Sequence, residues 1–196
     1  MFAVGHLAIG YLVAKTLEKL LQTEIDLPMV MMLSIIMDID LLVPQLQHRG
    51  LTHSLIIIGL ASIPLFFLKG KSIFPYLLAL AQHSFIGDFL TGDGVSAFWP
   101  LSSKFYGLGV KMMSLTNVFA EGSSFLAAFT LMLLSKDIIT MFNAKKTSLL
   151  LIFPLGTVFP VVVGQLAVPI ALLIPHYFLF ILFSGVLMIW IKNAVV

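Results

Sequence analysis

The chain has 196 residues, of which 60% are hydrophobic and only 10% are charged, and its formal net charge is +2. A soluble domain carries about 25% charged residues, so a chain this apolar could not cover its surface in water and is expected to reside in a bilayer. The absence of cysteine excludes disulfides and thiolate metal sites. The sequence contains no basic patch that would indicate nucleic-acid binding. The first residues lack the basic start and small-residue cleavage site of a signal peptide, so they are expected to belong to the mature protein.

Seven segments are apolar enough to be candidate membrane spans, each of which needs roughly 20 residues. They are residues 2–21, 27–46, 51–68, 73–92, 116–135, 147–173 and 174–192. The segment between the fourth and fifth candidates is too polar and too rich in glycine to span. The sequence therefore predicts an all-α fold, a polytopic membrane bundle of about six to seven helices, in a single domain over residues 1–196 with one polar loop.

Two of the candidate spans have features that complicate a simple crossing. The first carries Lys15, Glu18 and Lys19 in its second half, so it either spans the membrane or lies partly in the interface. The sixth contains three prolines, which predict kinks because proline removes a backbone donor and clashes with the preceding turn. These prolines are Pro154, Pro160 and Pro169.

The basic residues predict the orientation of the chain. If the seven segments alternate in direction, one side receives Lys15, Lys19, Lys69, Lys71, Lys136, Lys145, Lys146 and Lys192. The other side receives only Arg49, Lys104 and Lys111. Because short cytoplasmic loops are enriched in lysine and arginine, we expect a multi-pass protein of the cell (inner) membrane with a cytoplasmic C-terminus.

Titratable side chains from separate segments are all predicted to lie at the extracytoplasmic level. Histidine and acidic side chains at membrane depth are energetically costly and are usually paired or functional. Imidazole and carboxylate groups without thiolate are the ligands of hydrolytic zinc sites, and they also suit manganese or iron. The sequence therefore predicts a divalent metal, with zinc favoured, near His6, Asp38, Asp40, His48, His53, His83 and Asp88.

Two acidic residues in "DID" are expected to have different roles. Asp38 and Asp40 are two positions apart, so on an α-helix their side chains point about 200° apart. One is then expected to bind metal while the other orients a histidine N–H. The sequence alone does not choose between them at this point.

The segment "HRGLTHS" carries two histidines and the only arginine of the chain. Gly50 can turn the chain, and Thr52 is a candidate N-cap for the following helix. His53 would then lie in the first helical turn and point toward the metal. The guanidinium of Arg49 matches phosphate or carboxylate in a bidentate manner, which suggests a clamp for an anionic substrate.

Three further polar residues leave alternatives open. Glu121 lies at the outer edge of the fifth span, where its carboxylate could join the site. Asp93 in "TGDG" is typical of a turn, and His176 is consistent with an ordinary histidine near a helix start.

Several of these motifs resemble the YdjM-like family of membrane-bound metal-dependent hydrolases. The resemblance rests on His6 in "GHLAIGYL", "DID" at 38–40, "HRGLTHS" at 48–54, and the pattern from His83 through Pro100. The family is considered distantly similar to zinc-dependent phospholipase C. The resemblance therefore implies phosphoester hydrolysis by clustered histidine and aspartate.

One spacing departs from the family pattern, which usually has three residues between this histidine and this aspartate. Here "HSFIGD" places four residues between His83 and Asp88. On an α-helix, positions i and i+5 are turned about 140° apart, whereas i and i+4 share a face. Either the helix contains a one-residue π-bulge, or Gly87 marks the end of regular helix, or one of the two residues does not bind metal.

The leading hypothesis is a membrane-embedded metal-dependent hydrolase that acts on a phosphoester of the lipid-headgroup type at the extracytoplasmic face. Its expected metal ligands are His6, Asp38, His53, His83 and Asp88. Its expected catalytic residues are Asp40, His48 and Arg49, and its expected partner is membrane lipid, with no nucleic acid. Two alternatives remain: an ion or small-solute transporter that uses the same cluster, and a non-enzymatic membrane protein stabilised by metal. A transporter would more typically hold its site at the bilayer midplane on broken helices.

Overall fold

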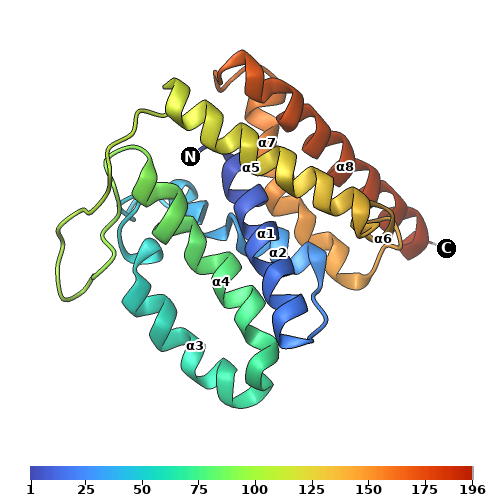
Figure 1. Ribbon diagram of the computed structural model, residues 1–196, viewed down its shortest axis with the longest axis horizontal. Coiled ribbons are helices and arrows are strands. Elements are labelled where there is room, and N and C mark those ends of the chain that lie inside the picture. The colour runs from blue at the N-terminus through green and yellow to red at the C-terminus, as the bar shows by residue number, and fades with distance from the viewer. Residues whose placement is uncertain (196) are drawn as a thin grey trace.

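A computed structural model describes residues 1–195, and within that range the fold is helical with no β-strand. The all-α prediction is confirmed, with eight α-helices in place of six to seven (Figure 1). They are α1 (Ala3–Leu21), α2 (Leu27–Leu33), α3 (Leu55–Lys69), α4 (Phe74–Gln82), α5 (Leu115–Leu134), α6 (Asp137–Met141), α7 (Ile152–Val162) and α8 (Ile170–Val195). Short 3₁₀ segments join several of them, notably η1 (Ile36–Leu42) and η2 (Leu51–His53).

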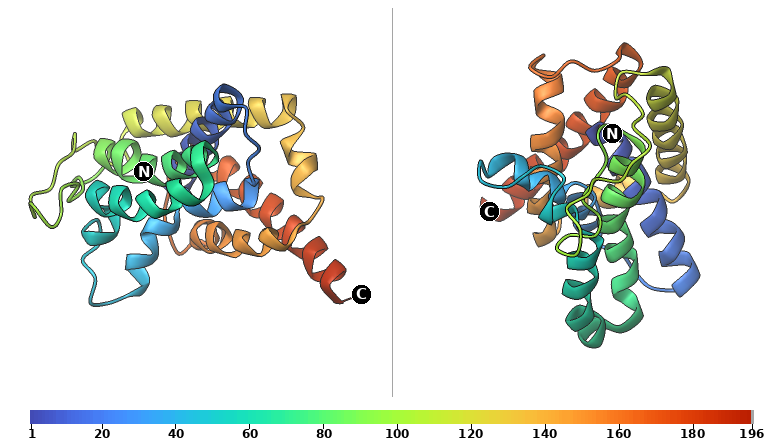
Figure 2. Two further views of the ribbon diagram at one scale, coloured as in Figure 1. Left: turned by 90° about the horizontal axis from the view of Figure 1, so that it is seen from below. Right: turned by 90° about the vertical axis from the view of Figure 1, so that its left-hand side faces the viewer.

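Helix α1 lies at the centre of the bundle. It packs against α4 and α5, and also contacts α2, α7 and α8 (Figures 1 and 2). Val4, Leu7, Tyr11 and Ala14 are spaced by three or four residues and are all buried, as expected for one face of a core helix. The first half of the helix is therefore part of the core, whereas its second half, residues 15–21, is partly or fully exposed, and the expectation that this half lies partly in the interface stays a prediction.

Two predicted spans are broken: the prediction of a continuous helix is wrong for 27–46, and 147–173, for which kinks were expected, is also interrupted. The segment 27–46 forms only the short α2 before it continues as the 3₁₀ segment η1. The carbonyl of Ser34, which would accept the next α-helical hydrogen bond, instead accepts one from Nδ1 of His83 at 2.9 Å. The segment 147–173 yields α7, which has 11 residues and ends before Gly164, a residue at φ 75°.

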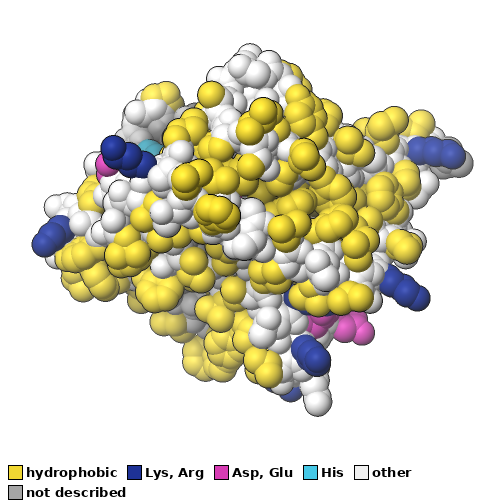
Figure 3. Space-filling model, turned by 45° about the horizontal axis from the view of Figure 1, so that its top comes forward, with side chains coloured by type: hydrophobic (Ala, Val, Ile, Leu, Met, Phe, Trp, Pro, Cys, Tyr) yellow, Lys and Arg dark blue, Asp and Glu magenta, His cyan; other side chains and the backbone are white. Residues whose placement is uncertain are grey.

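Three helical stretches are long and apolar enough to cross a membrane: Leu55–Asp88, Leu115–Leu134 and Ile170–Val195. The first comprises α3 and α4, between which the chain reverses near Gly70 (Figure 1). The 20 residues of α5 extend about 30 Å, which matches the hydrocarbon thickness of a bilayer. Figure 3 shows hydrophobic side chains across one wide face, with lysine and arginine side chains gathered at its edges.

The predicted polar loop between α4 and α5 does not span, and it packs against the "HRGLTHS" segment. The Ser96 N–H donates to the Arg49 carbonyl at 2.9 Å, and the Leu55 N–H donates to the Ala97 carbonyl at 3.0 Å. The Ser54 hydroxyl donates to the Trp99 carbonyl at 2.6 Å and also accepts from the N–H of the third residue of α3. Ser54 is therefore the N-cap of α3, and the prediction that Thr52 caps this helix is wrong.

Candidate metal centre

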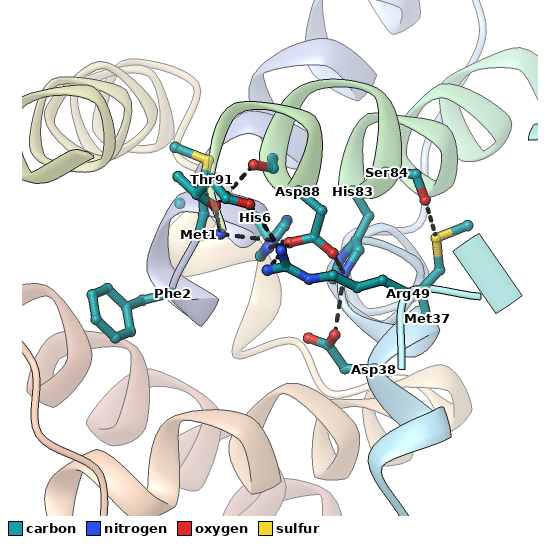
Figure 4. A network of polar contacts seen from close by, with 12 residues as sticks. Met1, Phe2, His6, Met37, Asp38, Arg49, His83, Ser84, Asp88 and Thr91 are labelled. Carbon is teal, nitrogen blue, oxygen red and sulfur yellow. Dashed lines mark hydrogen bonds and ion pairs between the residues drawn. The ribbon is translucent and has the colours of Figure 1, made fainter. Parts of the chain in front are cut away.

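Three segments bring four ligand-type side chains together. Asp38 comes from η1, His53 from η2, and His83 and Asp88 from the end of the α4 helix. One ligand atom of each residue lies within 4.8 Å of the ligand atoms of the others, and we call these four residues the central cluster. Figure 4 shows the side chains of Asp38, His83 and Asp88 directed toward one another.

The distances between ligand atoms in the central cluster are short. His53 Nε2 lies 3.2 Å from Asp88 Oδ2 and 3.8 Å from Asp38 Oδ1. His83 Nε2 lies 3.3 Å from Asp38 Oδ1 and 3.5 Å from Asp88 Oδ2. Both histidines are fully buried, and the side chain of Asp88 is 2% exposed.

The unusual spacing of His83 and Asp88 is accommodated by a π-helix. Residues His83–Asp88 form six residues of π-helix that continue α4 without interruption. A wider turn brings position i+5 back to the face of position i, so both side chains reach the same point. Of the three alternatives for this motif, the structure contains the π-bulge, with Gly87 inside the π-helix and not at the end of the helix.

Each clustered imidazole is oriented by a hydrogen bond at Nδ1. His83 Nδ1 donates to the Ser34 carbonyl at 2.9 Å, since that carbonyl can only accept. His53 Nδ1 lies 3.2 Å from Asp40 Oδ2 and 2.9 Å from the Thr52 hydroxyl. Such contacts fix the tautomer of a metal-binding histidine and leave Nε2 free as the ligand atom. Sequence reasoning did not identify Ser34, which lies 49 positions from His83, and it named Thr52 only as a candidate N-cap and not as a partner of His53.

Asp40 points away from the central cluster and supports the "HRGLTHS" segment. It accepts hydrogen bonds from the Thr52 hydroxyl at 2.7 Å and from the Arg49 N–H at 3.2 Å, and His48 Nδ1 lies 2.9 Å from it. The expectation that the two aspartates of "DID" point apart is therefore confirmed. The helix type differs: η1 is a 3₁₀ helix, in which residues two apart are still about 120° apart around the axis.

The electrostatics of this region follow from the same contacts. Burial favours a low pKa for His53, but the carboxylates of Asp38, Asp40 and Asp88 close to its ring outweigh burial and raise the pKa to about 10. Burial favours a high pKa for Asp40, but hydrogen bonds from His53, His48 and Thr52 lower it to about 2. Without a metal ion, a protonated His53 together with Arg49 would thus balance the surrounding carboxylates.

Several polar atoms of the central cluster have no hydrogen-bond partner among residues 1–195. They are His53 Nε2, His83 Nε2 and Asp88 Oδ2, and all are buried. An unsatisfied buried polar group costs about 1–3 kcal/mol, so three that converge on one point call for a shared partner. The separations of 3.2–3.8 Å are close to the edge of a tetrahedron with metal–ligand bonds of about 2.0–2.2 Å, which is about 3.4 Å. The residues therefore fit a divalent cation held by two nitrogens and two oxygens.

His6 lies beside the central cluster. Its ring stacks on that of His83 with centroids 3.8 Å apart and planes 13° apart, and its Nε2 lies 3.5 Å from Asp88 Oδ1. Neither ring nitrogen has a hydrogen-bond partner in the described part of the chain. The stacking requires glycine at position 87, because a Cβ there would lie 2.2 Å from Cε1 of His6.

Arg49 and His48 flank the cluster on the side of the loop. Arg49 donates to Asp88 Oδ1 at 2.9 Å and to the Thr91 carbonyl at 2.8 Å, so its guanidinium contacts a ligand-type carboxylate directly. The side chain of His48 is 38% exposed, the most open of the clustered histidines, and its ring stands edge-on to His53. All eight residues predicted for the site are thus brought together, and their roles in metal binding and catalysis stay predictions.

Glu121 acts on the site indirectly. It is fully buried and accepts hydrogen bonds from the N–H groups of Phe2 at 2.8 Å and Gly5 at 3.1 Å at the start of α1, and the Gly5 N–H also bonds the Phe2 carbonyl. The carboxylate therefore fixes the end of the helix that carries His6. In the sequence, only the position of this carboxylate at the edge of an apolar span indicated that it could belong to the site.

Two other polar residues lie outside the cluster. Asp93 is exposed in a turn, as expected. His176 is buried in α8, its Nδ1 bonded to the Leu172 carbonyl at 2.7 Å, and it belongs to neither group of ligand-type residues found in the described chain.

The family whose model describes YdjM inner membrane proteins matches residues 1–192. The match extends beyond the motifs of the first half to include α5, α7 and nearly all of α8. No curated protein and no solved structure matches the chain.

Proposed function

This chain belongs to the YdjM inner membrane protein family, and from that membership and the geometry of the centre we propose that it is a membrane-embedded, metal-dependent hydrolase of phosphoesters. The observation that carries the proposal is the convergence of three buried, unpartnered ligand atoms within the described chain, on His53, His83 and Asp88. A purely structural cluster of this kind would be expected to satisfy its own hydrogen bonds.

The metal would be held by Asp38, His53, His83 and Asp88, with His6 next to them. A divalent metal bound there would lower the pKa of a coordinated water and polarise a phosphoryl oxygen. The nitrogen and oxygen ligands favour zinc, and manganese or iron also suit them.

The chain's own residues supply orientation and charge. Asp40 contacts Nδ1 of His53 and so keeps Nε2, the other ring nitrogen, directed at the centre. His48 is partly exposed and is held by Asp40 at 2.9 Å, a position from which it can accept a proton from an attacking water. Arg49 places a guanidinium next to Asp88, where it can hold an anionic substrate oxygen.

A lipid phosphoester at the extracytoplasmic face is the proposed substrate. The excess of lysines in the other set of loops favours an outer position for the cluster, as expected from the sequence. The resemblance of the motifs to enzymes distantly similar to zinc-dependent phospholipase C favours phosphoester over acyl chemistry.

The test combines metal content with turnover. The protein is purified in detergent, and its bound metal and its hydrolysis of a chromogenic phosphodiester are measured for the wild type, His53→Ala and His176→Ala. We expect His53→Ala to lose both metal and turnover, while His176→Ala, which removes a buried histidine outside the cluster, retains both.

Two results would contradict the proposal in different ways. Unchanged metal content in His53→Ala would contradict the proposal that the central cluster binds the metal. Metal that depends on His53 without any turnover of phosphoesters would favour the non-enzymatic alternative, in which the ion stabilises the fold.

A further inference from the structure

A pocket of about 500 Å³ opens directly beside the central cluster. At one end it is lined by the polar side chains of His6, Asp38, His48, Arg49 and Asp88. Its volume lies within the roughly 300–1,000 Å³ that small-molecule sites occupy. The centre is therefore the polar end of a larger binding space.

The rest of this pocket is apolar and is formed mainly by two elements, η1 and α7. The apolar lining includes Ile35, Ile39, Leu42, Phe153, Pro160 and Leu166. Several of these side chains are also open to the surroundings: Leu42 is 77% exposed, and Leu166 is 46% exposed. The apolar part of the pocket is therefore open to the surroundings, as the entry of a lipid chain would require.

Gly156 forms a gap in the α7 wall of this pocket. A Cβ built on it would meet no atom of residues 1–195 within 4 Å. Glycine within a helix is about 1 kcal/mol less favourable than alanine. At this position it lowers the stability of α7 and leaves open space at the wall of the pocket. A larger side chain at this position would enter the pocket without first displacing a neighbour.

We propose that this pocket receives the apolar chain of a long-chain lipid phosphoester, whose phosphate lies at the polar end of the pocket. The inference rests on the proposed function and adds where the long alkyl, acyl or prenyl chain of that lipid phosphoester lies. Charge complementarity supports it: with a divalent metal offsetting Asp38 and Asp88, an anionic phosphate would lie beside Arg49, while the chain would lie along walls that are apolar except for Thr157.

The pocket acts through orientation more than through affinity. A lipid chain that enters the pocket is transferred from the apolar interior of the bilayer and not from water. The hydrophobic effect therefore contributes little to its binding. What the enclosed walls supply is a fixed position for the scissile bond next to the catalytic groups, which raises the rate for substrates that have a chain.

The test compares substrates that differ only in their chain. p-Nitrophenyl hexadecyl phosphate and p-nitrophenyl ethyl phosphate are hydrolysed by the metal-loaded protein in phosphatidylcholine nanodiscs, for the wild type, Gly156→Leu and Gly59→Leu. Gly59 lies in α3, is also exposed, and a Cβ added there would likewise meet open space, so it controls for an added leucine. We expect Gly156→Leu to lower the ratio of long-chain to short-chain kcat/KM at least tenfold, which is about 1.4 kcal/mol of transition-state stabilisation. Gly59→Leu should leave the ratio unchanged.

A second measurement does not depend on turnover. Metal-stripped protein in the same nanodiscs is labelled with a hexadecyl phosphate that carries a diazirine on its chain, and the labelled peptides are mapped. We expect labelling of the peptides that contain η1 and α7, with its loss in Gly156→Leu and its retention in Gly59→Leu.

The outcomes separate this inference from the proposed function. Equal chain ratios in Gly156→Leu and the wild type, together with undiminished labelling, would overturn the pocket assignment while hydrolysis itself stands. If neither ester is hydrolysed, the proposed function fails, and the labelling still decides whether the pocket binds a lipid chain.

Discussion

His83 Nε2 and Asp88 Oδ2 lie 3.5 Å apart, although the two residues are five positions apart on one helix. An α-helix would direct these side chains about 140° apart, and only the π-helix of His83–Asp88 brings them to one point. Because the same helix also presents His83 Nδ1 to the Ser34 carbonyl, the π-turn sets the position of the whole cluster.

Removal of one residue from the π-turn is expected to leave the centre intact. Phe85 is 65% exposed, and deletion of Phe85 would convert the π-turn into a regular α-turn with the histidine and aspartate at i and i+4. We expect the deletion variant to bind the same number of metal ions as the wild type, measured by plasma mass spectrometry on the purified protein. Asp88→Asn is the matched comparison and should lose metal; loss of metal in a well-folded deletion variant would show that the π-geometry itself is required.

The two aspartates of "DID" are expected to differ in their effect on metal binding. Asp38→Asn removes a ligand-type carboxylate from the central cluster and should abolish stoichiometric binding. Asp40→Asn leaves all four residues of the central cluster in place and weakens the contacts that orient His53 and the "HRGLTHS" segment, so it should keep the wild-type stoichiometry but weaken binding by about 10–100-fold. Competition with a chelator of known affinity measures both. Equal losses in the two variants would contradict the division of roles.

The metal-free protein is expected to lose stability as pH rises above neutrality. The pKa of His53 is raised from its ordinary value of 6.5 to about 10, so the folded state holds a proton that the unfolded state releases. The resulting stabilisation is complete below pH 6.5 and is lost as pH rises through about 10. Thermal unfolding in the presence of a chelator should therefore show a Tm that falls between about pH 7 and about pH 9. His53→Gln, which cannot be protonated in this range, should lack that decline.

Gly87→Ala is expected to disturb His6 selectively. A Cβ at this position would lie 2.2 Å from Cε1 and 2.4 Å from Nδ1 of His6, so the ring must move away from Asp88. If His6 contributes to the metal centre, metal affinity should fall about tenfold or more, as expected for the loss of a supporting group. Gly59→Ala, at a position with open space, is the control. Unchanged affinity in Gly87→Ala would place His6 outside the metal centre.

Glu121→Gln is expected to destabilise the fold without removing the metal. The amide has one acceptor oxygen in place of two and brings an N–H donor toward the N–H groups of Phe2 and Gly5, so the Phe2 N–H would lose its acceptor or the Gly5 N–H would keep only its bond to the Phe2 carbonyl. An unsatisfied buried donor costs about 1–3 kcal/mol, which should appear as a lower Tm. Ser123→Ala, on the exposed side of the same helix, should change Tm little. A Tm unchanged by Glu121→Gln would contradict the capping role of this carboxylate.

The long helices and the set of site residues could be predicted from the sequence. Helices α5 and α8 are long, apolar and uninterrupted, so hydropathy alone located them. The site residues could be named because carboxylates and imidazoles are rare in such a chain and recurred at one expected depth. The odd spacing of His83 and Asp88 even indicated the π-bulge that the structure contains.

The break in the segment 27–46 could not be predicted, because the contact found at the break is with a residue far along the chain. The Ser34 carbonyl accepts a hydrogen bond from His83 Nδ1, which is 49 positions away, and no local sequence pattern predicts that pairing. Thr52 was a reasonable candidate cap by local rules, but its hydroxyl donates to Asp40 and Ser54 takes over the capping position. In both cases a tertiary hydrogen bond outweighed the local preference.

The central place of α1 has a consequence for the biogenesis of the protein. This helix is synthesised before the elements that enclose it, and the carboxylate that bonds its first N–H groups comes from Glu121, which is 119 positions after Phe2. Until α5 has entered the membrane, the Phe2 N–H lacks this acceptor, and the end of α1 that carries His6 is not fixed by Glu121. If the proposed centre binds an ion, nascent chains that end before α5 should therefore hold it less tightly than the full chain, because the four central residues precede α5 but His6 is not yet fixed beside them.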